Sequence, residues 1–497
     1  MKISLSWLQQ YLKVDLSTDE LSELLTDIGL EVEGIHKYET IKGGLKGVVI
    51  GKILTVDKHP DADRLNLTTV DVGTEDPLQI VCGAPNVAIG LNVPVATVGT
   101  RLYDGDESFK IKRSKIRGQI SNGMICGPDE IGLGPKTDGI MELPDDAEVG
   151  TAGADYFNVN EDIVFEIGLT PNRSDAMSHI GVARDLKAVL NSRGDDLKMC
   201  MPSIKDFKID NKDLTIDVKI ESESLCPRYS GVSISNVTVN ESPDWLKHKL
   251  LSIGINPINN IVDVTNYVLH ETGQPLHAFD TEKILGKEII VKTLSNDTNF
   301  ITLDESNRKL SDNDLMICNA KEPMCIAGVF GGLDSGVTKN TNSIFIESAY
   351  FDPTSIRKTA KYHKLNTDAS FRYERGCDPN ITVYALKRAA LLIKELCGGE
   401  ISSDVVDIYP NPIEDFSINF SFNNLNKLIG EELDRNLVKS IIKNLEIKIL
   451  EENDDTLSLL VPPYRTDVRR EVDVIEDILR IYGFNSCLLY TSPSPRD

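Results

Sequence analysis

Two polar segments of this sequence contain most of the side chains that could do chemistry. One runs from Asn259 to Asp280 (NNIVDVTNYVLHETGQPLHAFD), and the other runs from Thr367 to Pro379 (TDASFRYERGCDP). Each segment interleaves apolar residues with groups that need hydrogen-bond partners, which is typical of a pocket that positions a polar substrate. A satisfied hydrogen-bond network inside a large domain explains any one of these polar residues better when it is taken alone. Together with Gly331, Gly332 and Glu347 between them, the segments favour a binding site.

The elements that must position these segments form a mixed α/β region from about residue 207 to residue 400. Ser343 to Ile346 is an apolar run typical of a strand, and Val383 to Leu396 has the apolar spacing of a helix. Cys397-Gly398-Gly399 predicts the end of that helix, because glycine readily adopts the backbone conformations that close helices. The region is expected to form one mixed domain around the candidate site.

Helical patterns occur at both ends of the N-terminal region. Residues 1–38 are predicted to form short helices, with Ser17 to Glu20 supplying N-cap candidates and Gly29 ending the second helix. Residues 151–200 have helical spacing again, notably from Ala183 to Leu190. We expect these two stretches to form one α-rich domain.

A β-rich stretch at residues 39–150 separates the two helical stretches. Its short apolar runs are broken by Gly, Pro and Asp, which is typical of a small barrel of the OB type. The barrel is therefore predicted to be an insertion that splits the α-rich domain into 1–38 and 151–200. With the regions that follow, the fold class is multidomain α+β.

A further small domain is predicted at residues 411–486. Its expected elements are a strand at Ser417–Phe422, helices at Leu425–Leu428 and Arg435–Leu445, strands at Glu446–Leu450 and Thr456–Val461, and a helix at Val472–Tyr482.

The last eleven residues, Cys487 to Asp497 (CLLYTSPSPRD), fit no element upstream of them. They resemble a translated sequencing adapter, so we interpret them as an artefactual tail beyond which the natural protein would continue. A disordered Ser/Pro tail is the alternative.

Composition excludes several classes of protein. A chain of 497 residues is too long for one core, and roughly three or four domains are expected. The net charge of −24 argues against a protein that coats nucleic acid. The nine cysteines form no C-x-x-C pair or zinc pattern, and no run of eighteen apolar residues occurs. We expect a cytoplasmic protein with no membrane partner.

A basic run in the barrel is a candidate nucleic-acid-binding surface. On a single strand, Arg113, Lys115 and Arg117 would share one face, and Lys110 and Lys112 would share the other. Small OB-type barrels bind nucleic acid with such strands. A protected edge strand explains the charges equally well.

Four carboxylates near the end form a candidate metal site. Asp473, Glu476 and Asp477 would share one helix face, and Asp467 in the preceding loop could fold toward them. Oxygen ligands without Cys or His suit Mg²⁺. The alternative is a solvated ion-pair network with neighbouring arginines, namely Arg469, Arg470 and Arg480.

Two other charged clusters are predicted to be structural. Asn172 to Asp175 and Arg372 to Arg375 have the composition of ion-pair and capping networks, and contact with RNA or substrate is the alternative.

Nine motifs follow one another along the chain: KISLSWLQQYL, HPDADRL, IVCGAPN, TPNRSDAMS, INNIVDVTNYVLHETGQPLHAFD, GVFGG, IESAYFDP, TDASFRYERG and VPPYRTDVRREVDVIEDILRIYGF. Taken in this order, they resemble the β subunit of bacterial phenylalanyl-tRNA synthetase over the whole chain to Ser486. The motifs of the barrel resemble the tRNA-binding OB module attached to several synthetases.

The resemblance implies that residues 207–400 are a B3/B4 domain that hydrolyses tyrosine from mischarged tRNA(Phe). By the same resemblance, Glu347 accepts a hydrogen bond from the tyrosine hydroxyl. His277, Thr265 and Asn266 surround the aminoacyl ester and the water, and the pocket wall consists of Thr367, Ala369 and Gly331.

No nucleophile and base pair stands out in the sequence, so we expect a positioned water to attack the ester directly. His277 as an obligatory general base is a hypothesis, and a structural histidine is its alternative.

The resemblance also implies the partners of this chain. They are tRNA(Phe) and an α subunit that binds ATP, in an α₂β₂ heterotetramer. Residues 411–486 would be a helix-turn-helix-like B5 domain, and the four carboxylates a magnesium site. Two other functions stay open: a free-standing deacylase that clears mischarged tRNA, and an RNA-binding scaffold with an inactive pocket.

Overall fold

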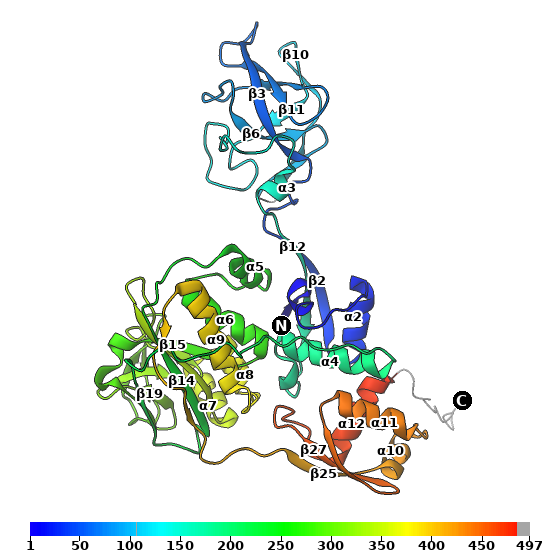
Figure 1. Cartoon of the computed structure of the whole chain (residues 1–497), viewed down its shortest axis with the longest axis vertical. Coiled ribbons are helices and arrows are strands. Elements are labelled where there is room, and N and C mark those ends of the chain that lie inside the picture. The colour runs from blue at the N-terminus through cyan, green and yellow to red at the C-terminus, as the bar shows by residue number, and fades with distance from the viewer. Residues whose placement is uncertain (106, 485–497) are drawn as a thin grey trace, which may run out of the picture. The chain divides into compact units, whose positions relative to one another are not determined.

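The computed structural model describes residues 1–105 and 107–484. Two compact units divide the chain. We call residues 37–162 the barrel unit, and residues 1–36 together with 163–484 the main unit (Figure 1). The tail predicted at Cys487–Asp497 lies outside the described residues.

The barrel unit is built on a five-stranded antiparallel sheet in the order β11-β6-β3-β4-β5. The edge strand β5 also contacts β11 at the other edge, so the sheet nearly closes. Alternate apolar residues fill its interior, among them Ile53, Val70, Ile80 and Val93. The elements are β3 Val48–Lys58, β4 Asn66–Asp71, β5 Leu78–Cys82, β6 Asn92–Thr97, β7 Arg101–Asp104, β8 Glu107–Lys110, β9 Ser114–Ile116, β10 Gln119–Ser121, β11 Gly123–Ile125 and α3 Gly153–Tyr156.

The single basic strand predicted from Lys110 to Arg117 is wrong. Lys110 ends β8 and Lys115 lies in β9, whereas Lys112 and Arg113 lie in the connection between these strands. The strand is interrupted because the Ile111 side chain is buried in a second core of the barrel unit, which also contains Leu102 and Cys126. Arg117 adopts a positive φ of 43° in the turn before β10. The five basic side chains are exposed, but they do not form the two predicted faces.

The N-terminal part of the main unit contains both helices and strands. Its sheet has the order β1-β12-β2, with β1 Lys2–Ser4, β12 Glu161–Gly168 and β2 Glu31–Glu39. Ser17 and Glu20 form a capping box at the start of α2, as their types predicted, and Gly29 follows this helix with a φ of 79°. Strand β2 corrects the all-helical prediction for residues 1–38, since pairing with β12 overrides local propensity. The helices are α1 Leu5–Leu8, α2 Thr18–Asp27, η1 Ser174–Ala176 and α4 His179–Ser192.

Two five-stranded sheets form the centre of the main unit. One has the order β15-β22-β14-β23 with β24 also paired to β14, and the other has the order β13-β16-β19-β20-β21. The bounds are β13 Asp217–Ile220, β14 Arg228–Ser235, β15 Leu276–Asp280, β16 Glu288–Thr293, β19 Leu315–Cys318, β20 Pro323–Ile326, β21 Phe330–Gly331, β22 Ser343–Tyr350, β23 Glu400–Ile401 and β24 Val406–Ile408. A small hairpin pairs β17 Asn299–Ile301 with β18 Asn307–Lys309.

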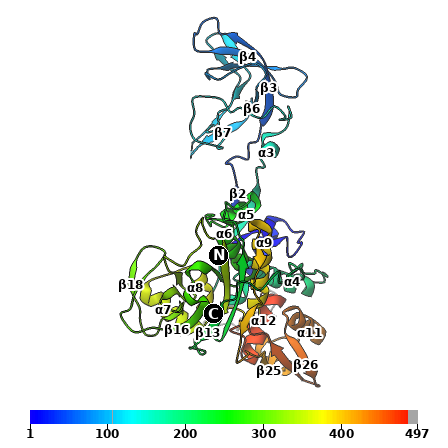
Figure 2. The same cartoon turned by 60° about the vertical axis from the view of Figure 1, so that its left-hand side comes forward.

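Helices cover one face of the β15-β22-β14-β23 sheet. The helices α6 Asn260–Thr272 and α9 Thr382–Cys397 contact each other, and α9 packs on β14 and β22 (Figures 1 and 2). The prediction of a helix ended by Gly398 is confirmed. The remaining helices of this region are α5 Asp244–Ser252, η2 Thr281–Lys283, η3 Leu285–Lys287, α7 Pro353–His363 and α8 Asp368–Tyr373.

Strand β22 separates two cores because its successive side chains point to opposite faces of the sheet. Ile344 and Ile346 face the core shared with α6 and α9. Phe345 and Ala349 face a second core, which we call the inter-sheet core because it also contains residues of β16, β19 and β20. The central strand is thus buried on both faces, and residue 347 shares the face of Phe345.

Residues 416–482 form the last group of elements. Strands β25 Phe416–Ser421, β26 Lys448–Glu452 and β27 Thr456–Val461 make a sheet in the order β25-β27-β26. The helices are α10 Phe422–Ile429, α11 Arg435–Asn444 and α12 Glu471–Tyr482, and they contact this sheet (Figure 1). Each predicted element is present, with small shifts at its ends. No helix in the described part of the chain is long and apolar enough to cross a bilayer.

Candidate functional site

Glu347 and His277 lie opposite each other on neighbouring strands. In the middle of β22, Glu347 pairs with His277 of β15 on one side and with Gly231 of β14 on the other. Directly opposed residues of an antiparallel pair have side chains on one face, with Cβ atoms about 4.5–5.5 Å apart. The fold therefore brings together two predicted site residues that are far apart in the sequence.

The Glu347 carboxyl is buried without a full set of partners. The residue is 4% exposed, and its Oε2 has no hydrogen-bond partner. Burial raises the pKa of Glu347 to about 7, although the nearby Tyr229 hydroxyl acts in the opposite direction. The two groups influence each other, yet neither Tyr229 Oη nor Glu347 Oε2 makes a hydrogen bond of good geometry. The carboxyl can therefore still accept a hydrogen bond from a ligand.

The His277 imidazole is neutral at physiological pH. Burial lowers its pKa to about 4. The residue as a whole is partly exposed, but its Nε2 is buried and has no hydrogen-bond partner. Its ring makes an edge contact with Phe279, with centroids 4.4 Å apart. A neutral ring nitrogen of this kind can orient a water, but a pKa of about 4 makes it a weak base.

Three predicted wall residues lie around the same core. A Cβ added to Gly331 would lie 3.2 Å from His277 Cε1 and 2.9 Å from Leu303 Cδ1, so glycine keeps this place open. Thr367 caps α8, and its Oγ1 donates to the Val329 carbonyl at 2.9 Å. Ala369 packs against the inter-sheet core.

Thr265 and Asn266 are placed differently. Both lie on α6, whose apolar residues Ile261 and Val264 belong to the core on the other face of the sheet. Thr265 is buried, and its Oγ1 donates to the Val262 carbonyl at 2.7 Å within the helix. Their role beside the ester and the water stays a prediction.

Several other polar residues of the two segments serve the scaffold. Asn259 caps α6 by accepting from the amides of Ile261 and Val262. The Gln274 side chain donates to the Ala349 carbonyl at 2.8 Å. Arg372 is buried and donates to the Met177 and Asp368 carbonyls. A structural network is thus the correct interpretation for these groups.

Of the four carboxylates proposed to bind metal, Asp477 is tied to arginines. Its Oδ1 accepts from Arg480 Nη2 at 2.9 Å, and its Oδ2 accepts from Arg465 Nη1 at 3.1 Å. Burial favours a higher pKa, but Arg480 and Arg465 outweigh it and lower the pKa of Asp477. Arg480 and Arg173 also bond to the buried Asp185. We call this set the arginine network; its members are Arg173, Asp175, Asp185, Arg465, Asp477 and Arg480.

The other three carboxylates do not complete a metal site in this arrangement. Asp473 lies in the first turn of α12, where its carboxylate accepts from the Arg470 amide at 2.8 Å and from Arg470 Nη2 at 2.8 Å. Asp467 accepts from Asn172 at 3.2 Å, and Glu476 is exposed. Within residues 1–105 and 107–484, no group of three or more His, Cys, Asp or Glu side chains is arranged to hold a metal ion.

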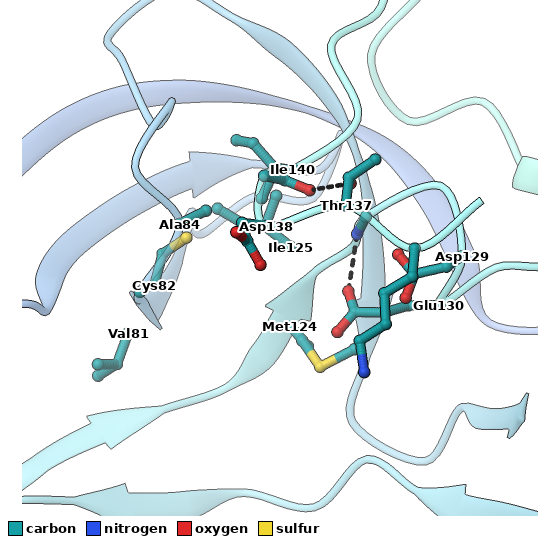
Figure 3. Close-up of a pocket in the computed structure, with 14 residues that line it drawn as sticks. Val81, Cys82, Ala84, Met124, Ile125, Asp129, Glu130, Thr137, Asp138 and Ile140 are labelled. Carbon is teal, nitrogen blue, oxygen red and sulfur yellow. Dashed lines mark hydrogen bonds between the residues drawn. The ribbon is translucent and has the colours of Figure 1, made fainter. Parts of the chain in front are cut away.

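The barrel unit has a cavity of about 320 Å³ beside Cys82 and Ala84. Asp138 lies on the same side as Ala84, Asp129 and Glu130 lie on the opposite side, and Glu130 accepts from the Gly127 amide at 2.7 Å (Figure 3). This acidic lining is unsuited to phosphate. The five basic residues predicted to bind tRNA lie outside the cavity.

Three family models match separate parts of the chain. They are described as "Putative tRNA binding domain" for residues 48–152, "B3/4 domain" for residues 225–398 and "tRNA synthetase B5 domain" for residues 418–484. The second range contains the Glu347 and His277 pair.

Several curated proteins share high identity with this chain. "Phenylalanine--tRNA ligase beta subunit" of Bacteroides fragilis strain YCH46 is 56% identical over 486 residues, covering 98% of this chain and 59% of the relative. The protein of that name from Bacteroides thetaiotaomicron is 56% identical over 492 residues, covering 99% of this chain and 60% of the relative. That from Porphyromonas gingivalis is 53% identical, with coverage of 98% and 59%.

This chain is related to the phenylalanine–tRNA ligase β subunits. The resemblance inferred from the motifs is thereby confirmed, although the chain spans about 59% of the length of these relatives. Among solved structures, an N-terminal fragment of the Pyrococcus horikoshii phenylalanyl-tRNA synthetase β subunit covers 65% of this chain and 87% of its own, with 15% identity and a TM-score of 0.33.

Sequence reasoning missed one residue beside the Glu347 and His277 pair. Tyr229 lies fully buried in β14, and its hydroxyl makes no hydrogen bond of good geometry. Residues 228–234 of β14 are all buried, so no alternation of buried and exposed residues singles out Tyr229 within the strand. Its proximity to Glu347 depends on how β14 pairs with β22, which no local pattern encodes.

Proposed function

We propose that this chain acts as the β subunit of a phenylalanine–tRNA ligase and hydrolyses tyrosine from mischarged tRNA(Phe). The observation that carries the proposal is the opposed pair of Glu347 and His277, each with a buried polar atom that lacks a partner. The relatedness to ligase β subunits and the B3/4 match over residues 225–398 support it. They favour this function over a free-standing deacylase or an inactive scaffold.

The chemistry explains why a second site is needed. Phenylalanine and tyrosine differ by one hydroxyl, and an apolar pocket rejects such an analogue weakly. In the proposed site, the Glu347 carboxyl accepts from the tyrosine phenol. A bound phenylalanine would leave that carboxyl buried and unpaired, a penalty of about 1–3 kcal/mol. The site therefore selects the incorrect amino acid for hydrolysis.

Hydrolysis proceeds by direct attack of water in this proposal. The water oxygen bonds to the ester carbonyl carbon, the bond to the ribose oxygen breaks, and the ribose oxygen takes the proton. Neutral His277 orients the water through Nε2. The nearby Cys325 remains a thiol because burial raises its pKa, so it is a poor nucleophile. Thr265, Asn266, Thr367, Ala369 and Gly331 have positioning roles.

The proposal extends to partners and parts of the chain. We infer an α₂β₂ assembly with an α subunit that binds ATP, cytoplasmic location, and contact between tRNA(Phe) and the exposed Lys110, Lys112, Arg113, Lys115 and Arg117. The proposed domains are 1–38 with 151–200, 39–150, 207–400 and 411–486, the last one helix-turn-helix-like. Magnesium at Asp467, Asp473, Glu476 and Asp477 would require the three aspartates to leave their present partners, so no step depends on it.

The test is release of tyrosine from Tyr-tRNA(Phe), measured for this chain alone and with an α subunit from a related ligase. Glu347→Ala should lower the rate by about ten- to a hundredfold, as expected for a lost hydrogen bond to a charged group. Phe-tRNA(Phe) should be hydrolysed slowly by both proteins. Glu282→Ala, which changes an exposed glutamate of the same region, is the matched control. Folded protein that releases no tyrosine in either preparation would contradict the proposal.

A further inference from the structure

Tyr229 is a buried tyrosine whose hydroxyl makes no well-formed hydrogen bond that would stabilise the fold. It is 0% exposed in the inter-sheet core, and its Oη makes no hydrogen bond of good geometry, although it lies close enough to Glu347 for the two groups to shift each other's pKa. Burying an unpaired hydroxyl costs about 1–3 kcal/mol, and phenylalanine would avoid that cost. Such an unpaired group in a native protein calls for an explanation.

The strand register directs Tyr229 toward Glu347. Tyr229 pairs with Ala349, and Gly231 pairs with Glu347, so Tyr229 and Glu347 are diagonal neighbours on one face. Diagonal residues lie about 7–8 Å apart at Cα, within reach of an aromatic side chain. A side chain at Gly231 would collide with the Phe345 ring. Tyr229 is therefore the residue of β14 that can reach the carboxyl from this side.

We propose that Tyr229 is a positioning residue of the editing site, whose hydroxyl donates to the Glu347 carboxylate and orients it toward the phenol of a misattached tyrosine. This inference rests on the proposed function for the identity of the ligand. The contact between Tyr229 and Glu347 does not depend on it.

The surroundings of Glu347 show why such a donor matters. The ionisable groups around it are His277 on β15, Tyr229 on β14, Cys325 on β20, and Cys226 and Tyr373 nearby. Burial lowers the pKa of His277 and raises those of the other four, so all are uncharged at neutral pH. The Tyr229 hydroxyl supplies the hydrogen bond that favours the ionised carboxyl, which is the stronger acceptor.

The first test measures Glu347 itself and needs no tRNA. The carboxyl is titrated by infrared difference spectroscopy in the wild-type chain and in Tyr229→Phe, with Glu347→Gln identifying its band. Loss of a donor to the charged form should raise the pKa of Glu347 by about one unit, a tenfold change in its ionisation constant. An unchanged pKa in folded Tyr229→Phe would overturn the proposal.

The second test measures hydrolysis as a function of pH. Tyr229→Phe should release tyrosine about five- to tenfold more slowly near pH 6.5 and approach the wild-type rate at higher pH, because the carboxyl ionises later. In a Glu347→Gln background, the same substitution should have no further effect.

Tyr373→Phe is the matched control, since that buried hydroxyl in the same core donates to the Ala349 carbonyl at 3.0 Å. It should lower the melting temperature without moving the pH profile. An equal shift of the profile in Tyr373→Phe would mean that core packing, and not the Tyr229 donor, controls Glu347. Failure of the wild-type chain to release tyrosine would reject the proposed function, whereas the infrared titration would still decide the Tyr229 contact.

Discussion

The face around Glu347 and the arginine network are both buried clusters of ionisable groups. The Glu347 carboxyl has no charged partner, whereas the carboxylate of Asp477 is paired with arginines. Burial raises the pKa of Glu347, and an oxygen of its carboxyl stays unpaired. Asp477 has arginine donors on both oxygens, and its pKa is lowered despite burial. The comparison teaches that burial alone does not mark a site. A buried group whose partner is missing is ready for a ligand, whereas a paired one holds the fold together.

Removing Asp477 would give the largest effect. Asp477→Asn leaves Arg465 and Arg480 buried with less compensating charge, which should cost about 3–5 kcal/mol of stability. The melting temperature, followed by circular dichroism, checks this prediction. Asp473→Asn serves as the control because its partner Arg470 is exposed, so the loss should be much smaller. Equal losses in the two variants would break the comparison, since burial of the pair would then not matter.

The second-largest expected effect is on the pH dependence of stability, which should differ between the two clusters. Glu347 has a folded-state pKa of about 7 against 4.5 ordinarily, so its ionisation disfavours the native state above pH 7. That penalty, at most about 3 kcal/mol, disappears as the pH falls toward 4.5. Asp477 has a lowered pKa, so its stabilisation is present at neutral pH and is lost as the pH falls below about 4.

Melting curves of two variants between pH 8 and pH 5 check this difference. Glu347→Gln should melt above the wild-type chain near pH 8, and the gap should close near pH 5. The deficit of Asp477→Asn should stay constant over the same range. A pH-independent gap for Glu347→Gln would mean that this carboxyl ionises normally.

The smallest expected effect sharpens the role of His277. Because its pKa is about 4, the ring is already neutral and should only orient the water. His277→Asn should therefore lower the release of tyrosine by no more than about tenfold, whereas loss of a general base costs about a hundredfold or more. His36→Asn, at an exposed histidine, is the control. A hundredfold loss in His277→Asn would restore the general-base hypothesis.

Much of the local structure followed from the sequence. The capping box at Ser17, the strand that contains Ser343 to Ile346 and the helix that ends before Gly398 are all present. Each depends on residue types within a few positions, such as a cap, a period or a glycine. The strand β2 and the interrupted basic run were missed, because pairing with β12 and burial of Ile111 are not local.

The sequence by itself determined most of the elements, the family relation and the types of residue available for chemistry. The tertiary structure decided which of those residues meet. It placed His277 opposite Glu347 and Tyr229 diagonally across from Glu347. It also paired Asp477 with Arg465 from the loop before α12 and with Arg480 of α12 itself. The physical reason is that a pKa and an unpaired hydrogen-bonding atom depend on neighbours in space, and strand register between distant segments selects those neighbours.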